Sequence, residues 1–85
     1  MILKIMQIKI KYFGQISEIM NAQESILKIN KNEATLFSIK SKLISEQAKL
    51  KEIDFKLAIN SRLVNEDVKL NNNDEISFFP PFAGG

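Results

Sequence analysis

Cysteine and histidine are both missing from the 85 residues of the sequence. Without them the chain has no thiol nucleophile, no disulfide, no thiolate or imidazole ligand for a metal, and no imidazole to move protons near neutral pH. Most familiar enzyme chemistry is thereby excluded for the chain's own side chains, and we expect no metal site.

Glycine is also scarce, with 3 residues in the chain. Only Gly14 lies outside the Gly84-Gly85 end, so the sequence has no glycine-rich loop, and it has no GxxxxGK[ST] motif that would hold phosphates. The sequence therefore predicts no bound cofactor, and we do not expect this chain to bind ATP itself.

An excess of one charge sign is lacking as well. The 12 lysines and arginines and the 10 aspartates and glutamates are interspersed, and a net charge of +2 does not suggest a nucleic acid or a membrane as partner. No stretch approaches the roughly 20 apolar residues of a membrane span, and residues 1–6 are too short for the apolar part of a signal peptide. We therefore expect a cytoplasmic protein.

Alternation of apolar and polar residues predicts most of the secondary structure. The first strand is predicted by Met6, Ile8, Ile10 and Tyr12, which alternate with polar residues. Further strands are predicted over 25–30, 55–59, 63–64 and 75–79. Helical spacing of apolar residues predicts a short amphipathic helix or turn over 16–20, and turn-forming residues predict turns at 60–62 and 71–74.

The main helix is predicted between the second and third strands. Thr35 is a suitable N-cap for a helix that runs to about residue 49. One face of this helix is predicted to consist of Leu36, Ile39, Leu43 and Ile44. A chain of 85 residues has room for one core, so residues 1–85 are expected to form a single domain. The order of elements predicts an α+β fold with one main helix across one face of a mixed sheet.

The last ten residues, from Ile76 to Gly85, contain no charged side chain, although 26% of the chain is charged. Pro80 and Pro81 lack backbone N–H donors and restrict the residues before them, so the strand is not expected to continue beyond Phe79 as part of a ladder. We therefore expect residues 80–85 to leave the sheet as a flexible functional tail.

The residues of this tail become smaller toward its end. They are Pro80, Pro81, Phe82, Ala83, Gly84 and Gly85. Because glycine has no Cβ to collide with the walls of a narrow channel, this shape suggests a tail that enters a channel in a partner protein. Phe79 and Phe82 are apolar residues near the exit of the tail and are candidates for the interface with that partner.

Gly85 carries the terminal carboxylate, which is the group of the tail that can react. At an α-carboxyl pKa of about 3.3 to 3.7 the carboxylate is ionised in the cell, and in that form it is a poor electrophile. Gly85 would need a partner enzyme that activates it, for example as an acyl adenylate. In an arbitrary protein, a Gly-Gly end is a frayed terminus without function. The apolar, proline-stiffened segment before it and the order of strands and helix argue against that interpretation here.

Several segments of the chain match a pattern that is known from one protein family. They are Lys9 to Phe13, Ser17-Glu18, Ala58-Ile59-Asn60, Leu63-Val64, Leu70, Asn73-Asp74-Glu75-Ile76 and Phe78 to Gly85. Together they resemble the small subunits of molybdopterin synthase, which are ubiquitin-like sulfur carriers. The Pro-Pro-x-x-Gly-Gly end is the specific part of this resemblance, since a Gly-Gly end alone is shared with the thiamine-pathway sulfur carrier and with ubiquitin-like modifiers.

The resemblance implies a β-grasp (ubiquitin-like) fold and a reaction cycle. A ubiquitin-activating-like enzyme would adenylate Gly85 with ATP, and sulfur from a donor protein would replace AMP to give a thiocarboxylate. The tail would then enter the large subunit of molybdopterin synthase and donate sulfur to cyclic pyranopterin monophosphate, forming the dithiolene in molybdenum cofactor biosynthesis. The family assembles as a heterotetramer of two small and two large subunits. The partners supply every catalytic side chain, so whether this subunit by itself counts as an enzyme stays open.

The chain departs from the family pattern at three positions. Asn73 stands where glycine is usual, which costs little because asparagine tolerates a left-handed backbone. Ser17 replaces the usual arginine, which leaves open any ion pair with Glu18 or with a partner. Phe82 replaces a residue of the size of valine, so the channel of the partner would have to be wider at that point.

Other functions remain open from the sequence. A sulfur carrier of another pathway, such as thiamine synthesis, is opposed by Pro80-Pro81 and by the length of the chain. The chain could also be a ubiquitin-like protein modifier that forms isopeptide bonds through Gly85, or a plain binding module with an accidental Gly-Gly end. Glu18, Asp74 and Glu75 have no basic or metal partner in a motif, so they are assigned to the surface or to turns instead of acid–base work.

Overall fold

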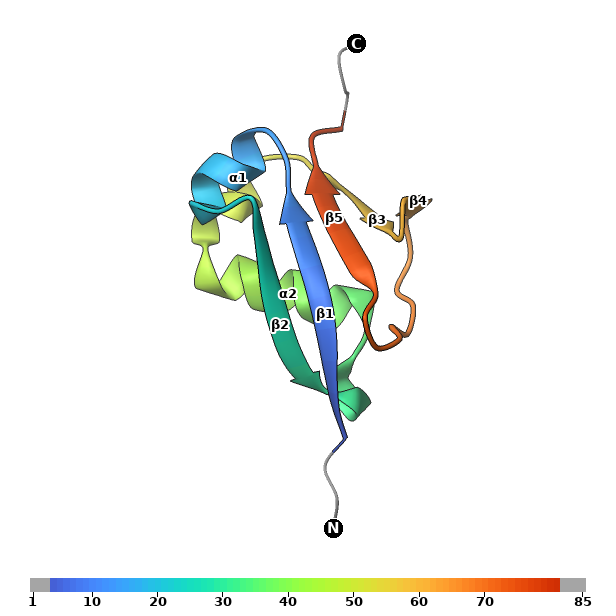
Figure 1. Cartoon of the computed structure of the whole chain (residues 1–85). Coiled ribbons are helices and arrows are strands. Elements are labelled where there is room, and N and C mark those ends of the chain that lie inside the picture. The colour runs from blue at the N-terminus through green and yellow to red at the C-terminus, as the bar shows by residue number, and fades with distance from the viewer. Residues whose placement is uncertain (1–3, 82–85) are drawn as a thin grey trace.

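The computed structural model describes residues 4–81, which form a five-stranded mixed sheet with one main helix across one face (Figure 1). The strands are β1 (Ile5–Tyr12), β2 (Glu24–Asn30), β3 (Lys56–Ile59), β4 (Arg62–Val64) and β5 (Glu75–Phe79). The helices are α1 (Gln15–Met20) and α2 (Leu36–Glu46), and 3-10 segments span Lys31–Glu33 and Ala48–Glu52. The predicted α+β fold class is confirmed.

The strands of the sheet follow the order β2-β1-β5-β3-β4. β1 pairs antiparallel with β2 and parallel with β5, while β3 pairs antiparallel with both β5 and β4. The first and last strands of the sequence therefore lie side by side within the sheet, and their C-terminal ends lie at the same end of the sheet (Figure 1). This topology places the chain that follows Phe79 beside the connection between β1 and α1.

The hydrophobic core lies between the sheet and α2. The alternation predicted for the first strand is confirmed, because Met6, Ile8, Ile10 and Tyr12 of β1 are all buried. The core also contains Leu36, Ile39 and Leu43 of α2, Leu57 of β3, and Ile76 and Phe78 of β5. Full burial of a large apolar side chain contributes about 1.5–3 kcal/mol relative to exposure, so this contact between helix and sheet is the main source of stability.

The start of α2 is capped as the sequence predicts. Thr35 Oγ1 accepts a hydrogen bond from the Ser38 N–H at 3.2 Å, and Asp67 Oδ1 accepts one from the Phe37 N–H at 2.9 Å. These contacts satisfy two of the backbone donors that a helix leaves unpaired at its start. Among residues 4–81, no helix is long and apolar enough to cross a membrane.

The end of α2 differs from the prediction. The helix stops at Glu46 instead of near residue 49, because Gln47 leaves the helical region with φ −134° and ψ 92°. The chain continues as the 3-10 segment Ala48–Glu52, which packs against α1 and buries Leu50 in the core. A straight helix would carry Leu50 about 10 Å beyond Leu43 along its axis, whereas the 3-10 segment returns it to the cluster.

The predicted turns at 60–62 and 71–74 are confirmed and contact each other. Asn60 and Ser61 have φ values of 49° and 71°, the left-handed pair expected for a two-residue hairpin between β3 and β4. Asp74 accepts hydrogen bonds from the Asn71 N–H at 2.7 Å and from Asn60 Nδ2 at 2.9 Å. Asn60 Oδ1 accepts a further one from the Glu75 N–H at 3.0 Å. The carboxylate of Asp74 therefore has the turn role that the sequence assigns to it.

Candidate functional site

The candidate site is the root of the tail, at the point where β5 ends. β5 lies between β1 and β3, so the chain leaves the sheet next to β1 and not from an edge strand (Figure 1). Phe78 points into the core, and its ring centroid lies 5.3 Å from that of Phe55 and 6.2 Å from that of Tyr12. This aromatic cluster fixes the position from which the tail starts.

The two prolines after β5 are half-buried against the body of the domain. The Phe13 N–H donates a hydrogen bond to the Phe78 carbonyl at 3.0 Å, which joins the ends of β1 and β5. Pro80 lies against Gly14, and Pro80 and Pro81 line a recess of about 300 Å³ beside α1. The root of the tail is therefore in contact with the connection between β1 and α1.

Of the residues predicted for the site, the structure places Phe79, Pro80 and Pro81. The other four, Phe82, Ala83, Gly84 and Gly85, lie outside the described residues, and their roles stay predictions. Phe79 is half-buried and lies on the face of the sheet opposite α2, whereas its neighbour Phe78 belongs to the core. We refer to the face that carries Phe79 as the open face, because no helix within residues 4–81 covers it.

Four further apolar side chains are exposed on the open face; two of them, Ile5 of β1 and Ile26 of β2, are 56% and 52% exposed. Phe13, which extends β1 beside the end of β5, is 46% exposed, and Leu63 of β4 is 55% exposed. We call Phe13, Leu63 and Phe79 the open-face patch. Apolar groups exposed together on one face of a small domain are typical of a contact surface for another protein.

Charged residues of both signs occupy β1, β2 and β5 on the same face. Lys9 Nζ lies 3.6 Å from Glu24 Oε2, and Lys11 Nζ lies 3.7 Å from Glu75 Oε1. Since these side chains are about one third to one half exposed, each pair contributes at most about 1 kcal/mol to stability. The charges beside the open-face patch are therefore better suited to orienting a partner than to holding the fold together.

The polar side chains near the root of the tail are engaged within the domain. Within residues 4–81 there is no cluster of three or more acidic, cysteine or histidine side chains that could hold a metal ion. Ser17 Oγ donates a hydrogen bond to the Gly14 carbonyl at 2.7 Å, and the hydroxyls of Tyr12 and Ser25 share one of 2.8 Å. These three hydroxyls are therefore engaged in hydrogen bonds within the described part of the fold.

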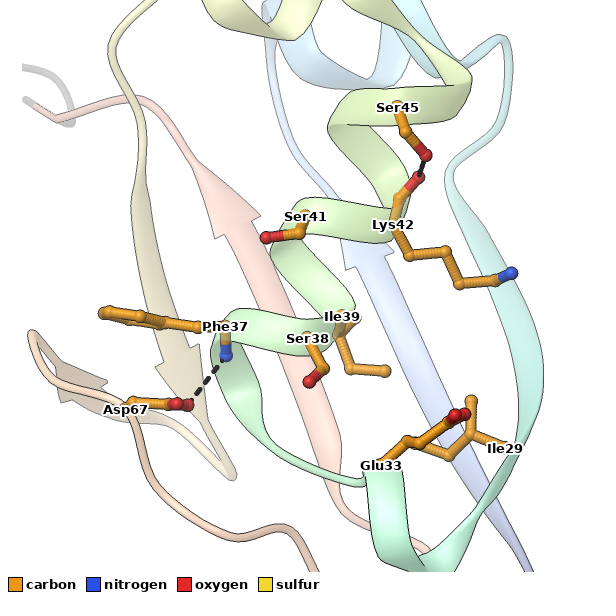
Figure 2. Close-up of a pocket in the computed structure, with 9 residues that line it drawn as sticks. All are labelled: Ile29, Glu33, Phe37, Ser38, Ile39, Ser41, Lys42, Ser45 and Asp67. Atoms are coloured by element: carbon orange, nitrogen blue, oxygen red, sulfur yellow. Dashed lines mark hydrogen bonds between the residues drawn. The ribbon is translucent and has the colours of Figure 1, made fainter.

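A second hollow, of about 630 Å³, lies over the outer face of α2 (Figure 2). Its lining residues are Ile29, Glu33, Phe37, Ser38, Ile39, Ser41, Lys42, Ser45 and Asp67. Two of its polar contacts belong to the fold, since the Phe37 N–H donates to Asp67 and Ser45 Oγ donates to the Lys42 carbonyl at 2.7 Å (Figure 2). No lining residue belongs to the tail root or to the open-face patch, so we do not assign this hollow to the site.

Three residues of the site were not predicted to belong to it from the sequence. Gly14 had one signal, since it is the one glycine outside the Gly84-Gly85 end and lies at the break that follows the first predicted strand. Phe13 and Leu63 had none, because an apolar residue within or next to a strand normally belongs to the core. Their exposure follows from the absence of a helix over the open face, which depends on how distant parts of the chain pack.

Residues 10–85 match the ThiS family. The molybdopterin synthase sulfur carrier subunit of Dictyostelium discoideum is 30% identical over 84 residues, which cover 93% of this chain and 96% of that protein. The structure of the putative molybdopterin converting factor, subunit 1, from Pyrococcus furiosus is similar with a TM-score of 0.82 and 23% identity, and the match covers 91% of this chain and 99% of that one.

A third relative is one chain of the complex of subunits 1 and 2 of molybdopterin-converting factor from Helicobacter pylori. It is 26% identical with a TM-score of 0.67, and the match covers 94% of this chain and 100% of that one. These similarities confirm the predicted β-grasp, ubiquitin-like fold and the resemblance to molybdopterin synthase small subunits. Because the match runs from Ile10 to Gly85, the chain belongs to the ThiS family.

Proposed function

We propose that this chain is the sulfur carrier subunit of molybdopterin synthase and that Gly85 is its carrier residue. One observation carries the proposal: the match to the ThiS family extends to residue 85, in a chain whose β5 leads from beside β1 directly into Pro80 and Pro81. The 30% identity to the Dictyostelium discoideum sulfur carrier subunit supports the choice of pathway.

In the proposed cycle, the carboxylate of Gly85 attacks the α-phosphate of ATP on a ubiquitin-activating-like enzyme, and pyrophosphate leaves. The acyl adenylate has AMP as a good leaving group, so sulfur from a donor protein replaces AMP and a thiocarboxylate results. The thiocarboxylate sulfur forms a bond to a side-chain carbon of cyclic pyranopterin monophosphate, and an oxygen substituent leaves that carbon. Water then hydrolyses the acyl C–S bond of the resulting thioester, so that sulfur stays on the pterin and the carboxylate of Gly85 is released. Two such transfers complete the dithiolene of molybdopterin.

The proposed partners are the large subunit of molybdopterin synthase, the adenylating enzyme and the sulfur donor, all in the cytoplasm. We infer that the large subunit accepts the tail in a channel and contacts the open-face patch, in a heterotetramer of two small and two large subunits. The Helicobacter pylori relative, which is part of a complex of subunits 1 and 2, supports a partner of this kind. The exposure of Phe13 and Leu63 supports the choice of surface.

The first test is the intact mass of the protein after co-expression with an adenylating enzyme and a sulfur donor. A carrier gains about 16 Da, the difference between sulfur and oxygen. A protein modifier would instead give a ladder of heavier adducts on lysines. A mass that stays unchanged with active partners would contradict both functions and favour a plain binding module.

The second test assigns the pathway. The thiocarboxylated protein is mixed with a molybdopterin synthase large subunit and cyclic pyranopterin monophosphate, and the dithiolene product is measured. We expect one product for every two carrier chains consumed. A thiocarboxylate that forms but yields no dithiolene would point to another sulfur-transfer pathway, such as thiamine synthesis.

A further inference from the structure

We propose that Gly14 is a positioning residue of the tail: because it lacks a side chain, Pro80 can pack directly against it, and this contact sets the direction of the chain after Pro81. The inference rests on the proposed function, since the direction matters if the tail must enter a channel of a partner. We call this packing the Gly14–Pro80 contact.

The backbone of Gly14 is held in place on both sides. Its carbonyl accepts hydrogen bonds from the Ser17 N–H at 3.1 Å and from Ser17 Oγ at 2.7 Å. The preceding Phe13 N–H donates to the Phe78 carbonyl at 3.0 Å. Gly14 itself has φ 58° and ψ −135°, a conformation that strains a residue with a side chain. The connection between β1 and α1 therefore presents a fixed surface to the tail.

The space between Gly14 and Pro80 is too small for a side chain. A Cβ on residue 14 would lie 2.9 Å from Cγ and 3.5 Å from Cδ of Pro80. Carbon atoms that are not bonded prefer separations of about 3.5–4.0 Å, so the shorter distance requires Pro80 to move. Proline cannot move its ring by rotating a side chain, because the ring is closed on the backbone and fixes φ. A change of ring pucker moves Cγ by itself, but Cδ is bonded to the backbone nitrogen, so a displacement larger than a change of pucker displaces the main chain.

Pro81 passes this displacement on. It is also half-buried, and it shares with Pro80 a recess that is lined by Ile16 of α1 and by Ile53. Two consecutive prolines leave few soft angles between the Gly14–Pro80 contact and the residues that follow. A tail that starts in a fixed direction loses less conformational freedom when it binds, which favours association. The contact thus acts on binding of the tail and not on the chemical step.

The test combines Gly14→Ala, Pro80→Ala and the double variant. We expect Gly14→Ala to raise the KM of the thiocarboxylated protein for the large subunit by about 5- to 30-fold, the factor that corresponds to the conformational freedom of one backbone residue. kcat at saturation should change less than about twofold. In the Pro80→Ala background the same glycine substitution should raise KM far less, since the ring it collides with is gone. Equal effects in both backgrounds would overturn the inference.

Measurements on the isolated protein test whether the Gly14–Pro80 contact exists, independently of the proposed function. The wild-type chain should show a nuclear Overhauser effect between Gly14 Hα and Pro80 Hγ, and Gly14→Ala should lower Tm more in the Pro80 background than in the Pro80→Ala background. If Gly14→Ala alone does not fold, rescue of folding by Pro80→Ala supports the contact. If neither Gly14→Ala nor the double variant folds, the nuclear Overhauser effect in the wild-type chain decides the contact, and its absence overturns it. If the wild-type chain transfers no sulfur, the proposed function fails, while these measurements still decide the contact.

Discussion

The two ends of β5 are held by different kinds of contact. At the start of the strand, side chains form a connected set of hydrogen bonds around Asp74, which is 9% exposed. Its two carboxylate oxygens accept from the Asn71 N–H and from Asn60 Nδ2. These bonds join the turn before β5 to the hairpin between β3 and β4, so they stabilise the fold across two connections.

At its other end β5 is held by the bond from the Phe13 N–H to the Phe78 carbonyl and by the packing of Pro80 on Gly14. No acidic or basic side chain takes part in these contacts. The difference indicates a division of work within one strand: under the proposed function, the hydrogen bonds at the start of β5 contribute to the free energy of unfolding, whereas Phe79 and Pro80 at its end present the tail and the open-face patch to partners. The preceding residue, Phe78, belongs to the core. Substitutions at the two ends should therefore affect different measurements.

Removal of Gly85 should have the largest effect on function. Under the proposed function, deletion of Gly85 removes the carboxyl group in the position that the partners recognise, so sulfur transfer should fall below detection. Tm should remain within about 1 °C, because loss of a terminal residue removes no core contact. The measurements are dithiolene formation and thermal unfolding. Addition of one alanine after Gly85 is the matched control and should also abolish transfer; a large loss of Tm in either variant would contradict the division of work.

Substitution of Phe78 should have the largest effect on the free energy of unfolding, and substitution of Phe79 should have the largest effect on binding to the large subunit. Phe78→Ala opens a cavity in the core and should lower the free energy of unfolding by about 3–5 kcal/mol. Phe79→Ala should lower it by less than about 1.5 kcal/mol, since the side chain is half-buried on the open face. The same substitution should weaken binding to the large subunit at least about tenfold if Phe79 belongs to the interface.

Urea unfolding and a binding titration separate these two effects. The pair is well matched, because the same side chain occupies two consecutive positions of β5 that point to opposite faces of the sheet. Equal losses of stability for Phe78→Ala and Phe79→Ala would show that the open face is covered by something other than a partner.

Asp74→Ala should destabilise the protein by about 1–3 kcal/mol, because two donors lose their acceptor in a partly buried place. The KM for sulfur transfer should stay unchanged at a temperature where the variant is folded. Urea unfolding checks the first expectation and transfer kinetics the second. Glu66→Ala, at an exposed position, serves as control and should change stability by less than about 0.5 kcal/mol. An increase in KM for Asp74→Ala would mean that the start of β5 also controls the tail.

The elements that the sequence predicted well are those specified by neighbouring residues. β1 and β5 follow from alternation, Thr35 from its capping side chain, and the Asn60-Ser61 hairpin from residues that accept positive φ. The end of α2 was predicted wrongly because Gln47, Ala48 and Lys49 are good helix formers, and nothing in the local sequence stops the helix before them. What ends the helix is the packing of Ala48–Glu52 against α1, which local periodicity does not contain.

The candidate site also has features that the local sequence predicts and features that depend on the packing of distant parts of the chain. The composition of the tail was visible in the sequence, since a charge-free segment with two prolines is a local property. Gly14 was not visible as part of the site, because its contact with Pro80 exists only when β1 and β5 lie parallel and adjacent. Phe13 and Leu63 were missed for a related reason, since exposure depends on which face of the sheet the helices cover.

The smallest effects are expected far from β5, on the outer face of α2. Ser41→Arg introduces a large charged side chain into the hollow shown in Figure 2. Because Ser41 is exposed on a helix and arginine is a good helix former, the free energy of unfolding should change by less than about 0.5 kcal/mol. Sulfur transfer should keep its KM and kcat. Ser41→Ala, which leaves the hollow empty, is the matched control, and both are measured by urea unfolding and transfer kinetics. If Ser41→Arg impairs transfer while Ser41→Ala does not, a partner docks on α2, and the end of β5 is then not the only surface of this domain that the partners use.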